Sequence, residues 1–196
     1  MGPDQPLTGV GKTALGMAMV RAREARQVDR LFDDPLAEAF LRAAPQAFSE
    51  ERRAHDAGEA TGGLAALGAM FFVHGAMRTR FYDDYLQTAA SEGYRQVVLL
   101  AAGLDTRGYR LEWPRDTRLF ELDLPEVLTF KTAILAEQPA LPHCERIVVP
   151  VDLREELEQC VGPHRVRSGQ ANRMARRRPA HLLVRRRDRP TLQRHR

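Results

Sequence analysis

The apolar and polar positions in the first half of the chain follow a helical period. Residues 13–28 are rich in Ala, Met, Leu and Arg and contain no Pro, which predicts a helix. A second helix is expected to begin after the acids at 33–34, with Pro35 in its first turn. Residues 49–63 are charged and Gly-rich and predict a connection, and residues 64–90 predict a third helix. The first half is therefore predicted to be helical.

Large apolar side chains recur along the predicted helix 64–90. Side chains of this kind are more often buried in a core than used to line a cofactor site. We therefore expect the following residues to belong to the core: Met70, Phe71, Met77, Phe81 and Tyr85.

From Gly93 onward the pattern changes to short apolar runs. Residues 96–102 predict a strand buried on both faces of a sheet, and residues 117–123 and 146–152 predict two more strands. A helix is expected between the second and third strands, over residues 125–137. This order is typical of the opening of a doubly wound parallel sheet, so the predicted fold class is α/β with a helical lid before the sheet.

The basic charge of the chain is concentrated at its end. The 196 residues include 30 Lys and Arg and 26 Asp and Glu, a net charge of +4. Residues 164–196 hold 12 Arg and a single acid, a net charge of +11, which leaves −7 for the preceding residues. We expect three regions: a helical lid over 1–92, a core that contains the predicted strands over 93–163, and an Arg-rich, disordered tail over 164–196.

The cysteines and the N-terminus indicate the cellular compartment of the protein. Cys144 and Cys160 cannot form a disulfide framework, and they lack the paired spacing of a zinc site, so no metal is expected. The N-terminus has no basic region followed by an apolar run, and no apolar stretch approaches roughly 18 residues. These features predict a cytoplasmic protein that does not enter a membrane.

Small and acidic residues stand at the ends of the predicted strands, where ligands of doubly wound sheets bind. Gly103 follows the first strand, and a glycine there lets a ligand approach the backbone. Asp123 ends the second strand, where an acid can accept hydrogen bonds from both hydroxyls of a ribose. Asp152 follows the third strand and could accept a hydrogen bond from an adenine amino group. Together they fit a cofactor that contains a nucleoside.

The missing glycines narrow the choice of cofactor. A dinucleotide fingerprint requires glycines at Ala101 and Thr106 in addition to Gly103, so a nicotinamide-dependent enzyme is disfavoured. The segment that ends in Gly11-Lys12-Thr13 is similar to a phosphate-binding loop, but Pro6 stands where its leading glycine belongs. S-adenosylmethionine carries no pyrophosphate and fits the pattern better.

Several strings resemble one family. VVLLAAGLDTRGYRL, FELDLPEVLTFK and VPVDLRE resemble the class I S-adenosylmethionine-dependent methyltransferases related to leucine carboxyl methyltransferases, in their actinobacterial, mycobacterial-type branch. GVGKTALGMAMVRARE, RLFDDPLA and MRTRFYDDYL are similar to the same branch. The resemblance covers about residues 9–163, and it implies that residues 93–163 form a partial cofactor-binding core. It implies a Rossmann-like sheet, S-adenosylmethionine as cofactor, and methyl transfer to a carboxylate or hydroxyl oxygen of a small molecule.

The resemblance also implies roles for residues at the strand ends. Asp123 would bind the ribose hydroxyls, with Glu121 as a weaker candidate. Asp152 and Leu153 would contact the adenine, and Gly103 would line the methionine portion. Because the cofactor carries the reactive methyl group, no catalytic base is required, and none is assigned.

Two basic residues are implied as partners of the methionine carboxylate, Lys12 and Arg80. Each candidate role has an alternative. Arg80 could instead form a surface ion pair with Asp83 or Asp84, and Asp123 could instead cap the helix that follows it.

The resemblance stops near Val161, and the Arg-rich tail has two explanations. One is a basic arm that binds nucleic acid, although the tail has no Phe, Tyr or Trp for base stacking. The other is a shifted coding frame, in which the codons of Met174 and Ala175 necessarily yield Trp and residues 164–187 can be read as the segment that the family carries next. We favour the frameshift, which predicts a truncated, weakly active and poorly soluble methyltransferase. The alternative is a nucleic-acid-binding protein that acts through its tail.

Overall fold

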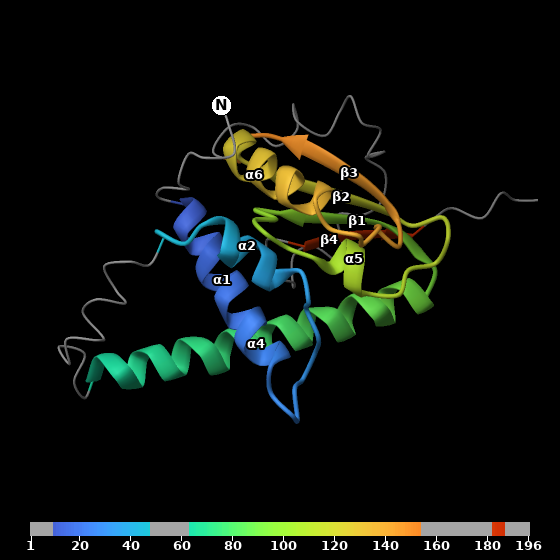
Figure 1. Cartoon of the computed structure of the whole chain (residues 1–196). Coiled ribbons are helices and arrows are strands. Elements are labelled where there is room, and N and C mark those ends of the chain that lie inside the picture. The colour runs from blue at the N-terminus through green and yellow to red at the C-terminus, as the bar shows by residue number, and fades with distance from the viewer. Residues whose placement is uncertain (1–9, 48–62, 154–181, 187–196) are drawn as a thin grey trace, which may run out of the picture.

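A computed structural model describes residues 10–47, 63–153 and 182–186 (Figure 1). Its elements are, in chain order, α1 (Val10–Ala25), α2 (Ala37–Ala43), α4 (Gly63–Ser91), β1 (Tyr94–Leu100), α5 (Arg107–Arg110), β2 (Arg118–Asp123), α6 (Pro125–Ala136), β3 (Glu145–Pro150) and β4 (Leu182–Arg186). The helices of the first half and the three predicted strands are confirmed. The short helix α5 lies where the sequence predicts only a connection.

The sheet has the strand order β3-β2-β1-β4. β1 and β2 run parallel, with Val98 opposite Phe120, and β2 and β3 run parallel, with Phe120 opposite Ile147. The apolar run of β1 is buried on both faces, through Val97 and Val98 in turn. Three parallel strands that alternate with helices give the predicted α/β, Rossmann-like architecture.

β4 adds a strand that the sequence analysis did not predict. It pairs antiparallel with β1, and Val184 lies opposite Val97. Without it, the outer edge of β1 would present unpaired backbone N–H and C=O groups, and an apolar segment can satisfy them by pairing. These five residues belong to the Arg-rich tail. The rest of the tail lies outside the described residues, and its disorder stays a prediction, as do the three domain boundaries.

Helices cover the sheet on the side of α4. Tyr82 and Leu86 of α4 share a buried cluster with Val97 of β1 and Leu119 of β2. α6 packs against the N-terminal helices as well as against the sheet: the rings of Phe40 in α2 and Phe130 in α6 have centroids 6.5 Å apart, and Lys131 of α6 donates to Glu121 of β2 (Figure 1). The helices α1, α2 and α4 are therefore attached to the sheet and not separate from it.

α4 has an exposed apolar side, which contradicts the sequence-based expectation. Met70, Phe71, Met77 and Phe81 are 68%, 45%, 62% and 61% exposed, and Tyr85 is half-buried. The buried side of α4 is formed by other positions, because only one stripe of a helix faces the sheet and α1. Figure 1 shows the N-terminal end of α4 projecting beyond α1. Although α4 has 29 residues, neither it nor another helix in the described part of the chain is long and apolar enough to cross a membrane.

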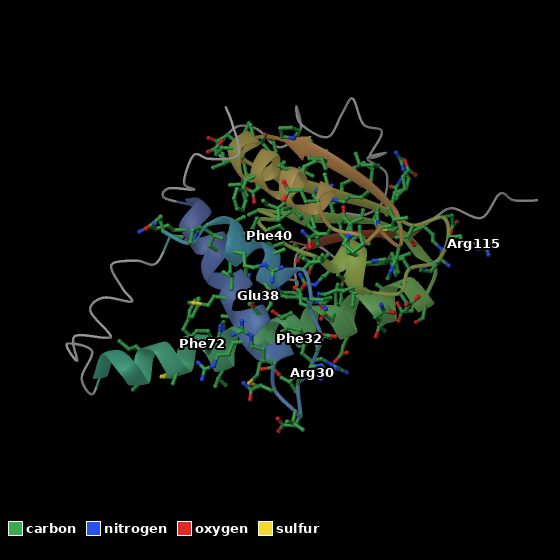
Figure 2. The ribbon with its side chains drawn as sticks, in the orientation of Figure 1. Arg30, Phe32, Glu38, Phe40, Phe72 and Arg115 are labelled. Carbon is green, nitrogen blue, oxygen red and sulfur yellow. The ribbon has the colours of Figure 1, made fainter. Side chains whose placement is uncertain are left out.

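α1 crosses α4 at a close contact. Gly75 of α4 faces Val20 of α1, and a Cβ atom at position 75 would lie 3.0 Å from a Val20 methyl group. Phe32 and Phe72 pack beside Val20 at the same crossing (Figure 2). The absence of a side chain at position 75 is therefore what lets the two helices approach.

Candidate cofactor-binding site

A cavity of about 270 Å³ lies where α1 and α4 meet the carboxyl end of β1. Its volume is near the lower end of the roughly 300–1,000 Å³ that small-molecule sites occupy. Its lining comes from α1, α4, β1, the loop after β1, α5 and the end of β2: Thr13, Ala14, Met17, Arg21, Arg78, Thr79, Tyr82, Leu99, Leu100, Ala101, Ala102, Gly103, Leu104, Asp105, Arg107 and Asp123. The cavity lies at the sheet edge where the sequence predicts a ligand.

The loop after β1 has an unusual backbone. Ala101 and Gly103 have φ angles of +51° and +52°, in the left-handed region. The Ala102 N–H donates to the Leu122 carbonyl over 3.0 Å, which ties the loop to β2. A Cβ atom at Gly103 would lie 3.2 Å from the Cβ of Ala14, so α1 passes directly against the glycine. Only glycine combines this backbone conformation with this close approach.

Asp123 lies beside this loop, at the end of β2, and is 5% exposed. Its Oδ2 accepts a hydrogen bond from the Gly103 N–H over 2.5 Å, and its Oδ1 accepts one from the Leu124 N–H over 2.7 Å. Leu124 is the residue that precedes α6, and no side chain caps that helix. Asp123 therefore does not cap α6. Its carboxylate joins the glycine loop to β2 at the cavity wall.

Asp105 places a negative charge in the cavity. Burial by itself raises the pKa of its carboxyl, but the surrounding cations, Arg107 foremost, lower that pKa to about 2. The Arg107 backbone N–H donates to Asp105 Oδ1 over 2.8 Å, and the Arg107 guanidinium forms an ion pair with the same carboxylate. Asp105 is consequently ionised at neutral pH.

Asp83 of α4 anchors the two arginines of α5. Arg107 Nε donates to Asp83 Oδ1 over 2.7 Å, and Arg110 Nη1 donates to Asp83 Oδ2 over 2.6 Å. The side chains of the three residues are at most 12% exposed. The ion pairs therefore hold α4 and the start of α5 together on one side of the cavity.

The structure distinguishes two arginines of α4. Arg78 lines the cavity. Arg80 does not, because positions two apart on a helix point to different sides. Its side chain is 51% exposed, and its Nε lies 2.9 Å from Asp84 Oδ2, which is the surface ion pair that the sequence analysis gave as the alternative. Lys12 is also exposed and does not line the cavity, although its neighbour Thr13 does.

Glu121 has surroundings that do not involve the cavity. Its side chain is fully buried, and its Oε2 accepts hydrogen bonds from Lys131 Nζ over 2.7 Å and Arg146 Nε over 3.0 Å. Burial lowers the pKa of Lys131, and the Glu121 carboxylate opposes that effect. Glu121 therefore belongs to a buried charge cluster between β2, β3 and α6.

Asp152 and Leu153 follow β3 and are half-buried. They do not line the cavity, and β2 separates β3 from β1. Residues 154–181, which come next, lie outside the described part of the chain. The contact of Asp152 and Leu153 with an adenine stays a prediction.

Of the predicted site residues, the structure brings Gly103 and Asp123 together in the cavity. Sequence reasoning missed Arg21, Arg78, Asp105 and Arg107, all of which also line it. Asp105 and Arg107 follow the first strand directly, so their position could have identified them. Arg21 and Arg78 carry no such signal, because only the orientation of α1 and α4 directs them to the cavity.

The structure is that of an α/β protein with a cavity at the carboxyl end of a parallel, Rossmann-like sheet. A model of the leucine carboxyl methyltransferase family matches residues 14–171, and the chain belongs to this family.

Three similar proteins carry the name "Putative S-adenosyl-L-methionine-dependent methyltransferase". The protein from Frankia alni is 56% identical over 149 residues, which cover 74% of this chain and 49% of the relative. The one from Streptomyces coelicolor is 46% identical over 149 residues, or 76% of this chain and 51% of the relative. The one from Mycobacterium bovis is 44% identical over 151 residues, or 76% and 46%. The chain thus spans about half the length of the curated relatives it matches.

Proposed function

We propose that this chain binds S-adenosylmethionine in the cavity beside Gly103 and transfers its methyl group to an oxygen of a small molecule. One observation carries the proposal. At the carboxyl end of the sheet, the Gly103 N–H donates a hydrogen bond to the Asp123 carboxylate over 2.5 Å, which brings the two predicted site residues together in the cavity wall. Membership of the leucine carboxyl methyltransferase family supports the cofactor, and the family name supports a carboxylate oxygen as the acceptor type.

The charges of the cavity fit the charges of this cofactor. S-adenosylmethionine has a cationic sulfonium, an ammonium and a carboxylate. Asp105 and Asp123 offer carboxylates to its cationic groups and hydroxyls, and Arg78 offers a guanidinium to its carboxylate. Gly103 lets Ala14 of α1 approach the loop, because a Cβ atom at position 103 would lie 3.2 Å from the Ala14 Cβ. The lining thus offers partners of opposite charge to both the ammonium and the carboxylate of the cofactor.

Each side chain of the cavity would have a simple task. Asp123 would accept hydrogen bonds from the ribose hydroxyls with the lone pairs that Gly103 and Leu124 leave open. Arg78 would fix the methionine end. The bound cofactor supplies the methyl group, and the protein contributes alignment of the acceptor and exclusion of water. A base is not needed when the acceptor is already a carboxylate.

Thermal unfolding with a panel of ligands tests the proposal. S-adenosylmethionine and S-adenosylhomocysteine are expected to raise the melting temperature of the full chain, because a ligand at 100 times its Kd stabilises the native state by about 2.7 kcal/mol. ATP with magnesium and NAD are expected to leave it unchanged, because the loop has the glycines of neither phosphate-binding motif. A melting temperature that rises with ATP or NAD but not with S-adenosylmethionine would refute the proposal.

A further inference from the structure

The loop between β1 and α5 requires support from outside itself. Ala101 has a φ angle of +51°, which costs a residue with a side chain on the order of 1–2 kcal/mol. Such conformations persist only where the surrounding structure holds them. β2 supports the first part of the loop, through Leu122 and Asp123. The second part, residues 104–106, is supported from α1 and from the loop between α1 and α2.

Arg21 of α1 makes this second support. Its Nη2 donates a hydrogen bond to the carbonyl oxygen of Leu104 over 2.6 Å, and its Nε donates to Asp34 Oδ2 over 2.7 Å. The same Asp34 oxygen accepts a hydrogen bond from the Thr106 hydroxyl over 2.6 Å. Arg21 and Asp34 therefore hold the residues on both sides of Asp105, which itself lines the cavity.

Stability alone does not explain the buried ion pair between Arg21 and Asp34. The side chains of Arg21 and Asp34 are 8% and 0% exposed, so both charges have lost their hydration. Among the described residues, Asp34 Oδ1 has no hydrogen-bond partner, and neither has Arg110 Nε, which lies 4.0 Å from Asp34 Oδ2. Buried ion pairs are often no more stabilising than apolar residues of the same size, and an unsatisfied buried oxygen adds a cost. What the arrangement does provide is a fixed geometry for the loop.

We infer that Arg21 is a positioning residue for cofactor binding: with Asp34 it fixes the loop that carries Gly103 and Asp105 in the conformation that receives the cofactor. This inference rests on the proposed function. It assigns to α1, and to the loop between α1 and α2 that carries Asp34, a part in cofactor affinity. Arg21 itself acts through Leu104 and Thr106.

The test uses the full chain and its Arg21→Lys, Thr106→Val and Thr106→Ser variants. A lysine at position 21 can form an ion pair with Asp34. It lacks the planar guanidinium that lets Arg21 donate to Asp34 and to the Leu104 carbonyl at the same time. Thr106→Val keeps the shape and removes the hydroxyl, whereas Thr106→Ser retains it. Arg26→Met is the matched control. It removes the ion pair that Arg26 forms at the surface with Glu38 of α2, outside the cavity lining (Glu38 is labelled in Figure 2).

Two readouts separate positioning from folding. Calorimetric titration with S-adenosylmethionine, well below the melting temperature, is expected to show affinity losses of about tenfold or more for Arg21→Lys and Thr106→Val. Thr106→Ser and Arg26→Met are expected to stay within about twofold of the unchanged chain. Hydrogen exchange without ligand is expected to be faster in residues 101–107 of Arg21→Lys, with α4 and α6 unchanged.

The outcomes distinguish this inference from the proposed function. If the unchanged chain binds no S-adenosylmethionine, the proposed function fails, and the exchange measurement still decides whether Arg21 holds the loop. If the unchanged chain binds and Arg21→Lys binds equally well, or if loop exchange is the same in both, Arg21 is not a positioning residue. If hydrogen exchange becomes faster throughout the Arg21→Lys variant, Arg21 contributes to the stability of the whole fold and not to the loop in particular. That result would also overturn the inference.

Discussion

Arg78 and Arg80 show how far two neighbouring side chains can differ. Arg78 lines the cavity, while Arg80 forms an exposed ion pair with Asp84 and donates to the Leu31 carbonyl over 2.8 Å. The hydrogen bond with Asp84 raises the pKa of the Arg80 guanidinium. Of these two arginines, Arg78 is the one whose side chain lies at the cavity.

The two positions give a matched pair of variants. Arg78→Met is expected to weaken S-adenosylmethionine binding by about 10- to 100-fold, because a charge-assisted hydrogen bond contributes about 1.5–3 kcal/mol. Arg80→Met removes the same charge from the same helix but outside the cavity, so its Kd is expected to change by less than about twofold. Calorimetric titration of both variants measures the difference. If the two variants lose equal affinity for S-adenosylmethionine, or if Arg80→Met loses more, Arg78 is not the partner of the cofactor carboxylate.

The same residues show what the sequence could and could not predict about the site. Gly103 and Asp123 were predictable because they end apolar strands, and parallel strands bring their carboxyl ends to one edge. Arg78 was not predictable, because a shift of two positions along a helix changes which side chain faces the cavity. The position of Glu121 outside the cavity was not predictable either, because the folded chain brings Lys131 of α6 and Arg146 of β3 to its carboxylate.

At the scale of elements, α4 is a helix with one packed and one exposed side. The buried stripe includes Ala76, Tyr82 and Leu86, whereas Met70 and Met77 are exposed. Apolar composition predicted the helix correctly, but it could not predict which apolar residues are buried, because α4 is apolar on more than one side. β4 also escaped prediction, since the tail around it is dominated by Arg.

The contact of α1 with α4 gives a prediction about stability. Gly75→Ala is expected to lower the free energy of unfolding by on the order of 1 kcal/mol, because the added methyl would overlap Val20, which is 1% exposed and β-branched. Gly68→Ala, in the same helix with nothing within 4 Å of the added atom, is expected to raise it by about 0.5–1 kcal/mol. Urea unfolding of both variants measures the two changes. A stabilised Gly75→Ala variant would show that the helices can separate without cost.

At the scale of the whole molecule, the charge of the chain has two sources. Residues 1–163 carry a net charge of −7, and residues 164–196 carry +11. All the described residues that line the cavity belong to the first of these regions, and the charged ones are three arginines (Arg21, Arg78 and Arg107) and two aspartates (Asp105 and Asp123). The overall basic charge therefore says little about the ligand of this cavity.

Length is the other property of the whole molecule that bears on function. The chain spans about half the length of the relatives it matches, and in the described residues the parallel part of the sheet consists of three strands. The described lining of the cavity and both supports of its loop nevertheless lie within residues 13–123. Cofactor binding can therefore be tested in this chain separately from methyl transfer.

The most direct test is calorimetric titration of the full chain and its Asp123→Asn variant with S-adenosylmethionine. We expect one cofactor per chain, and an affinity at least about tenfold lower in the variant, because the amide cannot accept hydrogen bonds at both of its terminal atoms. Asp33→Asn is the control, since the Asp33 side chain is 58% exposed and lies 4.0 Å from Arg30. No binding by the unchanged chain at millimolar cofactor, or equal binding by Asp123→Asn, would contradict the assignment of this cavity as the cofactor site.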